Sequence, residues 1–405
     1  PGWGPVAHGG GGDDPEPMSN TAVELTRQER EAELDLDQLK QLVGLVEYDE
    51  ERDPFPVTGW DAIVFVVGNA TQTAHYYQSA WGMELVGYSG PEYGNRDHKA
   101  FVLKSGSIRF VVKGAVSPDS PLIAHHAKHG DGVVDISLEV PDVDKCIAQA
   151  KAAGATVLQE PETVSDEHGS VRIGAIATYG ETRHTLVQRT IDGQTYAGAY
   201  LPGYVERSSN FVKRDGAPKR LFQALDHIVG NVELGKMDEW VAFYNRVMGF
   251  VNMAEFVGDD IATDYSALMS KVVANGNHRV KFPLNEPAIA KKKSQIDEYL
   301  EFYTGPGAQH LALATNDISI ALYNPRSRSR PDTLGAARDL LVEAVGPDRV
   351  VVVARHVGRD EESSWVTTLG ELDVEAVDMG CLVVVGASTT RVTDDGRVWT
   401  PRSVG

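Results

Sequence analysis

An internal repeat is the feature of this sequence that most restricts its fold. One copy begins with Trp60-Asp61-Ala62-Ile63-Val64 and continues through a helical pattern to Trp81-Gly82. The other begins with Leu225-Asp226-His227-Ile228-Val229, and its helical pattern ends at Met248-Gly249. In the second copy apolar residues recur at three- and four-residue steps, as in a helix that packs on a sheet. Both glycines stand where a helix C-cap is expected.

Strand-like segments follow each helical pattern. They lie at 99–103 and 108–112 in the first copy, and at 265–273 and 280–282 in the second. Each half then has another strand start after a glycine, at 132–138 and at 307–313. A strand–helix–strands unit used twice per half predicts a mixed sheet that curls around a cleft.

The two copies differ at two positions of chemical interest. His227 corresponds to Ala62, and His310 corresponds to Asp135. Two imidazoles from non-adjacent strands form part of the 2-His-1-carboxylate arrangement that binds non-haem Fe(II) and leaves positions open. The alternative is that each is a half-buried strand histidine without a ligand, and the spacing leaves both interpretations open.

Composition narrows the class of protein. The 405 residues suggest two or three domains at about 150 residues each. A hydrophobic content of 42% and a charged content of 24% are ordinary for a globular chain. The net charge of −20 argues against nucleic-acid binding through a basic surface. Two cysteines, Cys146 and Cys381, fit a reducing compartment, and the apolar runs are too short to span a membrane. We therefore expect a cytoplasmic protein without a nucleic-acid or membrane partner.

The N-terminal region 1–52 is expected to be an arm outside the folded repeats. Its Gly-rich start lacks the apolar region of a signal peptide, and Met18 is the more natural first residue. A solvated arm is the favoured interpretation. A surface helix using the spacing of Leu36, Leu39, Val43 and Val46 is the alternative.

Several long segments carry a family resemblance. They are 224–232, 256–263, 281–287, 293–300 and 307–313, and the last contains Gly307-Ala308-Gln309-His310. With their surroundings, from about 54 to 317, they resemble 4-hydroxyphenylpyruvate dioxygenase of the bacterial type, a family of the vicinal-oxygen-chelate superfamily. The resemblance implies an α+β fold with two βαβββ repeat domains. Residues 53–195 would form the structural domain, and residues 196–317 the truncated iron-binding domain.

The resemblance also implies an activity and a site. His227 and His310 would be two Fe(II) ligands, and the 2-oxo acid would chelate the iron beside an open position for O₂. The product would be homogentisate, as in tyrosine and phenylalanine catabolism, and the family commonly forms homodimers. Four polar residues match substrate-pocket positions of the family, where they would hold the phenol and the keto acid without adding charge. These are Ser270, Asn285, Gln295 and Gln309. For each, a solvent-facing polar residue is the alternative.

The resemblance ends near Asp317. The family continues with a late strand similar to Phe-Glu-Ile-Ile-Glu-Arg, which carries the third iron ligand, and no such segment follows here. The equivalent strand of the first copy, 184–187, has no carboxylate either. The glutamates after the break lie in helical or polar loop patterns, and they are Glu343, Glu361, Glu362, Glu371 and Glu375.

The tail, 318–405, has a different pattern. A strand at 318–323, a helix from Asp332 to Gly346 and unbroken β-branched runs at 350–354 and 382–385 predict a parallel-type sheet. Segments 321–327, 353–359, 367–372 and 385–390 resemble the C-terminal part of precorrin-3B methyltransferase. In that family S-adenosylmethionine lies between two lobes. Here the lobe with the first glycine-rich loop is absent, so Asn324 and Thr389 would mark half a site.

We interpret the chain as a junction product in which most of a dioxygenase meets a partial α/β methylase lobe near Asp317-Ile318. A misassembled or recombined gene explains the truncation of both parts better than a bifunctional fusion does. Three functions stay open at this point. They are an impaired dioxygenase, a methyltransferase fragment and a binder of metal or keto acid without turnover.

Overall fold

The computed structural model describes residues 43–49, 52–208, 221–256, 268–287, 293–315, 319–323, 325–326 and 332–400. Most of the expected N-terminal arm, including Leu36 and Leu39, lies outside the described residues, and so does the expected junction at Asp317-Ile318. None of the described helices is long and apolar enough to cross a membrane.

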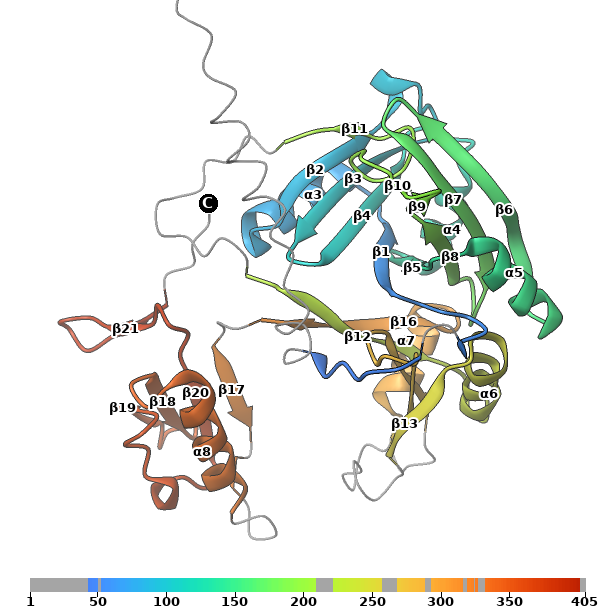
Figure 1. The fold of residues 1–405 in the computed structure, drawn as a ribbon. Coiled ribbons are helices and arrows are strands. Elements are labelled where there is room, and N and C mark those ends of the chain that lie inside the picture. The colour runs from blue at the N-terminus through green and yellow to red at the C-terminus, as the bar shows by residue number, and fades with distance from the viewer. Residues whose placement is uncertain are drawn as a thin grey trace, which may run out of the picture.

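The first repeat forms one curled, nine-stranded sheet (Figure 1). Its first unit comprises β1 (Gly59–Val66), α3 (Ala70–Trp81), β2 (Glu84–Ser89), β3 (His98–Ser105) and β4 (Ile108–Ala115). After α4 (Pro121–His129), its second unit comprises β5 (Gly132–Glu139), α5 (Val143–Ala152), β6 (Val157–Asp166), β7 (Gly169–Ala177) and β8 (Arg183–Gln188). The strand order is β11-β2-β3-β4-β1-β5-β8-β7-β6, where β11 is Val205–Glu206. Antiparallel pairing of β1 with β5 joins the two units. A small hairpin of β9 (Thr190–Ile191) and β10 (Gln194–Thr195) follows β8.

The described part of the second repeat contains one whole unit and the first strand of the next. The unit comprises β12 (Ala224–Asn231), α6 (Met237–Met248), β13 (Val251–Phe256), β14 (Leu268–Ala274) and β15 (Lys281–Pro287). After α7 (Gln295–Phe302) comes β16 (Gly307–Ala314). The strand order β13-β14-β15-β12-β16 leaves β16 at the edge, whereas its counterpart β5 is flanked by β1 and β8. Two βαβββ repeats with a truncated second one, as the sequence predicted, are therefore confirmed.

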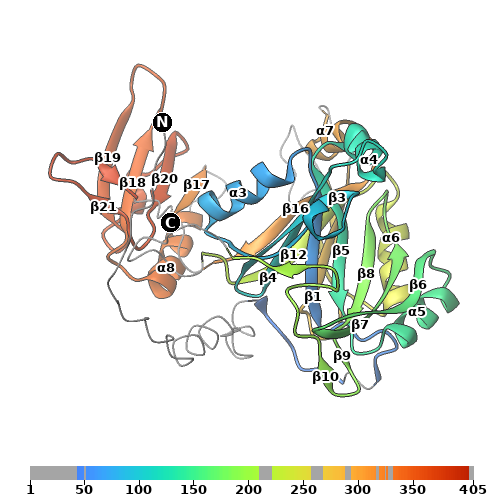
Figure 2. The same cartoon turned by 90° about the horizontal axis from the view of Figure 1, so that it is seen from above.

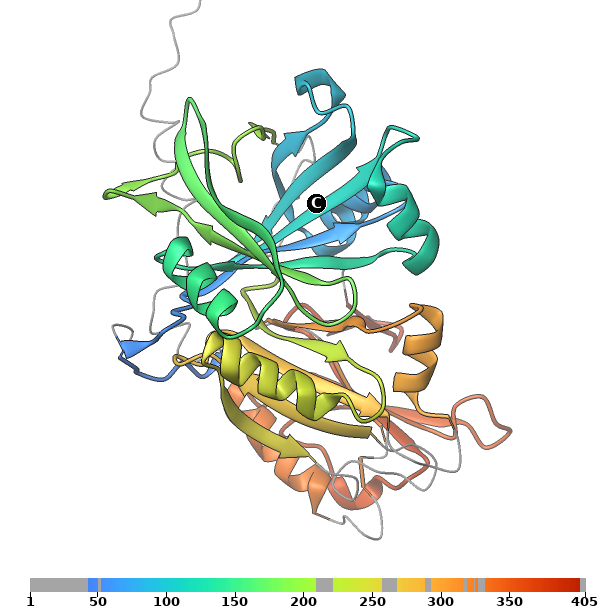
Figure 3. The ribbon, with the colours of Figure 1, turned by 90° about the vertical axis from the view of Figure 1, so that its right-hand side faces the viewer.

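The helix boundaries follow from capping chemistry. Both α3 and α6 end at a glycine, Gly82 and Gly249, each with φ of 65°. This left-handed conformation costs other residues energy because their Cβ atom crowds the backbone. The two repeats share one hydrophobic core, in which Tyr244 of α6 and Phe282 of β15 contact His184 of β8. Figure 3 shows α6 lying along the sheet of the second repeat, beneath the first repeat.

The tail forms a separate sheet with its own core. Its elements are β17 (Ile320–Tyr323), α8 (Thr333–Val345), β18 (Val350–Arg355), β19 (Ser363–Thr368) and β20 (Cys381–Val385), in the order β17-β20-β18-β19. A short hairpin of β21 (Arg391–Val392) and β22 (Val398–Trp399) follows. Buried residues from α8, β18 and β20 pack together and apart from the core of the repeats. Figures 1 and 2 show this unit set apart from the two repeats.

The prediction of a parallel-type sheet in the tail is wrong. The three described strand pairings of this sheet are all antiparallel. Strands β17 and β18, which α8 connects, run in the same direction, but β20 lies between them. In β18 Val351 and Val353 are fully buried while Val350 and Val352 are only half-buried. The β-branched run thus reflects strand propensity, because only alternate side chains face the core.

Candidate active site

The structure brings His227 and His310 together on neighbouring strands of the second repeat. Their ring centroids lie 5.9 Å apart with the ring planes at 70°. His227 on β12 is opposite Ala312, and His310 on β16 is opposite Val229, so the two rings are diagonal neighbours across the β12–β16 pair. Both face away from Ile228 and Leu311, which pack in the shared core.

A β-bulge precedes each of these histidines. The register of β12 against β16 shifts between Leu225 and His227, and again where Val229 and Gly230 face His310 and Ala308. The extra residues are therefore Asp226 and Gln309. A bulge places two successive side chains on nearly the same side of a strand, which is how bulges redirect side chains at functional sites.

Each bulge residue contacts the imidazole that follows it. The Nδ1 atom of His227 lies 2.7 Å from Oδ2 of Asp226, and the Nδ1 atom of His310 lies 3.0 Å from Oε1 of Gln309. Because the carboxylate and amide oxygens can only accept, Nδ1 is the donor in both rings. Nε2 is then the atom with a free lone pair. Outer partners of this kind fix the orientation and the tautomer of metal-bound histidines.

Electrostatics favour the ligating forms of these side chains. Lys281 Nζ lies 2.5 Å from Oδ1 of Asp226. Although partial burial opposes it, hydrogen bonding to His227 and Lys281 holds the pKa of Asp226 below its usual range. Burial, and then the nearby His227, lower the pKa of His310. The Asp226 carboxylate is therefore ionised and the His310 ring neutral near pH 7, as metal coordination requires.

The first repeat has the same two bulges without the histidines. Its register shifts place the extra residues at Asp61 and Val134, so Asp61-Ala62 is equivalent to Asp226-His227 and Val134-Asp135 to Gln309-His310. The correspondence of His227 with Ala62, and of His310 with Asp135, is therefore a property of the fold as well as of the sequence.

Ion pairs occupy the equivalent place in the first repeat. Asp61 is 2.6 Å from Arg189 and 3.1 Å from Arg109. Burial raises the pKa of Asp61, but the two guanidinium groups outweigh this effect, and the pKa lies below its usual value. Asp135 is 3% exposed and is paired with Arg183 at 3.0 Å. These ion pairs stand where the second repeat has its histidines, although Oδ2 of Asp61 has no hydrogen-bond partner among the described residues. A cavity of about 360 Å³ beside the start of α3 lies in this repeat too, away from the histidine pair.

The described residues supply no third ligand beside the histidine pair. Among them, the group of metal-ligating side chains whose ligand atoms all lie within 4.8 Å of one another is His125, His129 and Glu181 in the first repeat. His310 is exposed at the sheet edge, whereas its equivalent Asp135 is covered by β8. The two histidines therefore fit two positions of a 2-His-1-carboxylate site. The strand that would cover them is missing from the described sheet.

A row of polar side chains crosses the same face of the sheet. Ser270 on β14 is opposite Asn285 on β15, and Asn285 is level with Asn231 on β12. Ser270 and Asn285 are each 7% exposed and Asn231 is fully buried. Neither amide atom of Asn231, nor Oδ1 of Asn285, has a hydrogen-bond partner among the described residues. Buried polar atoms without a partner are costly, so this row is suited to receive a polar ligand.

The other expected residues are placed differently. Gln309 contacts His310 directly, so in this structure it orients a histidine. Gln295 is exposed at the first position of α7, just after the undescribed residues 288–292. In the tail, Thr389 is exposed, and Asn324 lies outside the described residues. Sequence reasoning missed Asn231 and the role of Asp226, although Asp226 directly precedes His227 and Asn231 lies four residues after it on the same strand.

Comparison with known proteins supports the family that the sequence resembles. Residues 59–176 and 224–327 match the model of the Glyoxalase/Bleomycin resistance protein/Dioxygenase superfamily. A 4-hydroxyphenylpyruvate dioxygenase from Yarrowia lipolytica is 40% identical over 278 residues, which are 67% of this chain and 69% of that protein. A mutant of 4-hydroxymandelate synthase from Streptomyces coelicolor has a similar fold, with a TM-score of 0.57 and 22% identity over 80% of this chain and 96% of that chain.

The methyltransferase CobJ is 36% identical over 20% of this chain and 34% of that chain. Its TM-score of 0.20 is too low to indicate a common fold. The family assignment therefore rests on the two repeats and on the relatives that match them. The chain belongs to the 4-hydroxyphenylpyruvate dioxygenase family.

Proposed function

We propose that this chain binds Fe(II) through His227 and His310 and acts on 4-hydroxyphenylpyruvate and O₂, giving homogentisate and CO₂. One observation carries the proposal. The rings of His227 and His310 lie together, and the Nδ1 atom of each has a hydrogen-bond partner, which in a neutral ring leaves the lone pair on Nε2. The first repeat has Ala62 and Asp135 at the equivalent positions. Iron would supply a Lewis-acidic centre that binds the 2-oxo acid and activates O₂.

The chain's own residues would then bind and orient the substrate. Asp226 and Gln309 keep the two rings in the ligating tautomer, and Lys281 keeps Asp226 ionised. Asn231 is four residues along β12 from His227, roughly 13 Å at the rise of a strand. The row of Ser270, Asn285 and Asn231 would therefore bind the phenol end while the keto-acid end lies at the histidines. Amide and hydroxyl groups suit a neutral phenol because they both donate and accept.

We further propose that turnover by this chain is low. Two imidazoles without a carboxylate lose one donor and the negative charge that partly neutralises the metal. The exposure of His310 also leaves the site open to water, and a closed, dry site is what protects oxidative chemistry from side reactions. A homodimer stays a prediction from the family resemblance, and a cytoplasmic location stays a prediction from composition.

The test is Fe(II)-dependent binding of the substrate under anaerobic conditions. With Fe(II), 4-hydroxyphenylpyruvate should raise the melting temperature of the unaltered chain, and the double variant His227→Ala/His310→Ala should lose this shift. A matched control, His75→Ala/His168→Ala, removes two histidines outside the site and should keep it. A shift that survives in the first double variant would place the iron and substrate elsewhere.

A further inference from the structure

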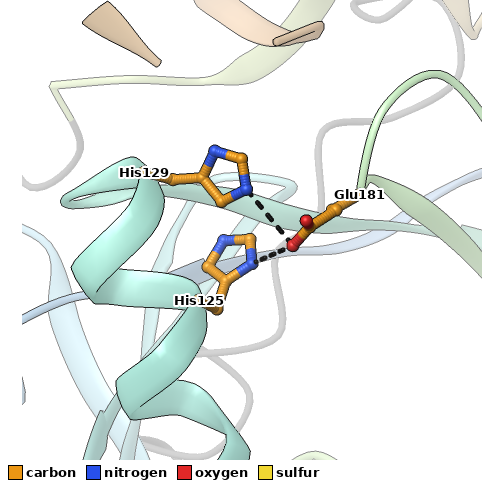
Figure 4. A group of neighbouring side chains, drawn as sticks. All are labelled: His125, His129 and Glu181. Atoms are coloured by element: carbon orange, nitrogen blue, oxygen red, sulfur yellow. Dashed lines mark hydrogen bonds and ion pairs between the residues drawn. The ribbon is translucent and has the colours of Figure 1, made fainter. Parts of the chain in front are cut away.

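We propose that His125, His129 and Glu181 form a second metal site, which takes a divalent ion of the zinc class and is separate from the His227–His310 pair. All three residues belong to the first repeat. In Figure 4 the two histidines project from one side of α4 toward the Glu181 carboxylate, which comes from the turn between β7 and β8.

The helix places the two rings side by side. Ser120 caps α4 and Pro121 is its first residue, so both His125 and His129 lie within the helix. Residues four apart lie on the same face of a helix, and the ring centroids of His125 and His129 are 4.5 Å apart. This spacing of two histidines with a more distant carboxylate is a common donor set for Zn²⁺.

The distances match those between ligands of one ion. Glu181 Oε2 lies 3.1 Å from His125 Nδ1 and 3.2 Å from His129 Nε2. In a tetrahedral zinc site with bonds of about 2.0–2.1 Å, neighbouring ligand atoms are about 3.3 Å apart. One carboxylate oxygen facing two ring nitrogens at these distances therefore outlines a coordination sphere with one corner left for water or another ligand.

A second observation points to a ligand at His129. Its Nδ1 atom lies 2.5 Å from the carbonyl oxygen of Tyr303. A carbonyl only accepts, so Nδ1 carries a proton, and in the neutral ring the lone pair is on Nε2. The side chain is 2% exposed, and Nε2 has no hydrogen-bond partner within the described part of the chain despite its closeness to Glu181. A buried nitrogen held in this tautomer by a carbonyl has the outer partner typical of metal-bound histidines.

The charges around the cluster leave the ligand oxygen available. Lys128 Nζ lies 2.5 Å from Oε1 of Glu181, the oxygen that does not face the rings. Lys128 therefore pairs with one oxygen of Glu181, and the other oxygen, Oε2, faces the two rings. The competing arrangement is a protonated His129 paired with Glu181, which needs no metal, and the experiment below separates the two.

A metal at this site would join the two repeats. Tyr303, whose carbonyl holds His129, follows α7 of the second repeat, and its ring packs on His129 with centroids 4.5 Å apart. Thr304 also donates a hydrogen bond to the carbonyl of Lys128. An ion that fixes α4 to the β7–β8 turn would therefore also fix the contact with α7, close to the start of β16.

The experiment uses the full-length His227→Ala/His310→Ala chain, stripped of metal and titrated with Co²⁺ alone. We expect one ion per chain and the intense visible absorption of tetrahedral Co²⁺. Adding His129→Gln or Glu181→Gln should weaken binding by more than the roughly 100-fold that loss of an outer partner can cost. The matched control is His126→Ala on the same helix, because His126 pairs with Asp131 outside the cluster.

Circular dichroism of each variant shows whether it is folded, and His125→Ala gives an independent test if one variant is not. A tetrahedral Co²⁺ spectrum lost in the cluster variants and kept in His126→Ala supports the site. No binding by the starting chain, or equal binding after Glu181→Gln, overturns it and assigns the cluster to a protonated ion pair.

Discussion

Replacement of Asn231 by leucine should stabilise the protein and weaken substrate binding. Asn231 is fully buried, and neither of its amide atoms has a partner among the described residues. An unsatisfied buried polar group costs about 1–3 kcal/mol. Leucine has the same branching without polar atoms, so Asn231→Leu should raise the free energy of unfolding by about 1–3 kcal/mol in the absence of ligand. Urea unfolding without substrate measures this difference.

Asn275 provides the matched control. It is also buried, at 1% exposed, but its Nδ2 donates to the Val57 carbonyl at 2.6 Å and its Oδ1 accepts from the Val280 N–H at 2.9 Å. Asn275→Leu leaves two backbone groups unpaired and should destabilise the protein. If Asn231→Leu destabilises as much as Asn275→Leu, the Asn231 amide has a structural role and the substrate-binding argument is refuted. If the argument holds, 4-hydroxyphenylpyruvate should bind Asn231→Leu about tenfold more weakly, a loss of about 1.4 kcal/mol.

Three further predictions concern stability and the site. Burial lowers the pKa of His184 to about 4 from 6.5, so the unfolded chain binds more protons than the folded chain between these pH values. The free energy of unfolding should therefore fall by about 3 kcal/mol from pH 6.5 to pH 4, and His184→Gln should flatten that slope in a pH series of urea unfolding curves. Asp226→Asn should weaken Fe(II) binding about 10- to 100-fold, because His227 loses its charged partner; equal affinity by competition titration would remove Asp226 from the site. Amides of the edge strand β16 should exchange with deuterium faster than those of β5, which has strands on both sides, and equal protection would show that another segment pairs with β16.

The repeat made much of the fold predictable. A shared layout of strand, helix and glycine cap predicted the paired βαβββ units, and aligning the copies singled out His227 and His310. The bulges at Asp226 and Gln309 could not be predicted, because a bulge is visible only as a shift between two paired strands. Asn231 was missed for a similar reason, since the lack of a hydrogen-bond partner is a property of the folded chain.

Elsewhere local patterns were misleading or incomplete. The valine run of β18 suggested that both faces of the strand are buried. In the structure only alternate valines are buried, and β20 runs antiparallel beside β18. The four-residue spacing of His125 and His129 shows in the sequence alone that both would lie on one face of a helix. Their carboxylate partner Glu181 is far away in sequence, and only the turn between β7 and β8 brings it close.

We propose that this chain has the substrate face and two metal ligands of a dioxygenase, and that its described residues lack the third ligand that would complete the site. The most direct measurement is homogentisate formation by chromatography, in parallel for the chain as it is and for a chain in which a dioxygenase-type C-terminus replaces everything after residue 317. We expect very little product from the first and restored turnover from the second. Comparable turnover by both would contradict the claim, because a residue after 317, such as one of its glutamates or His356, would then complete the iron site.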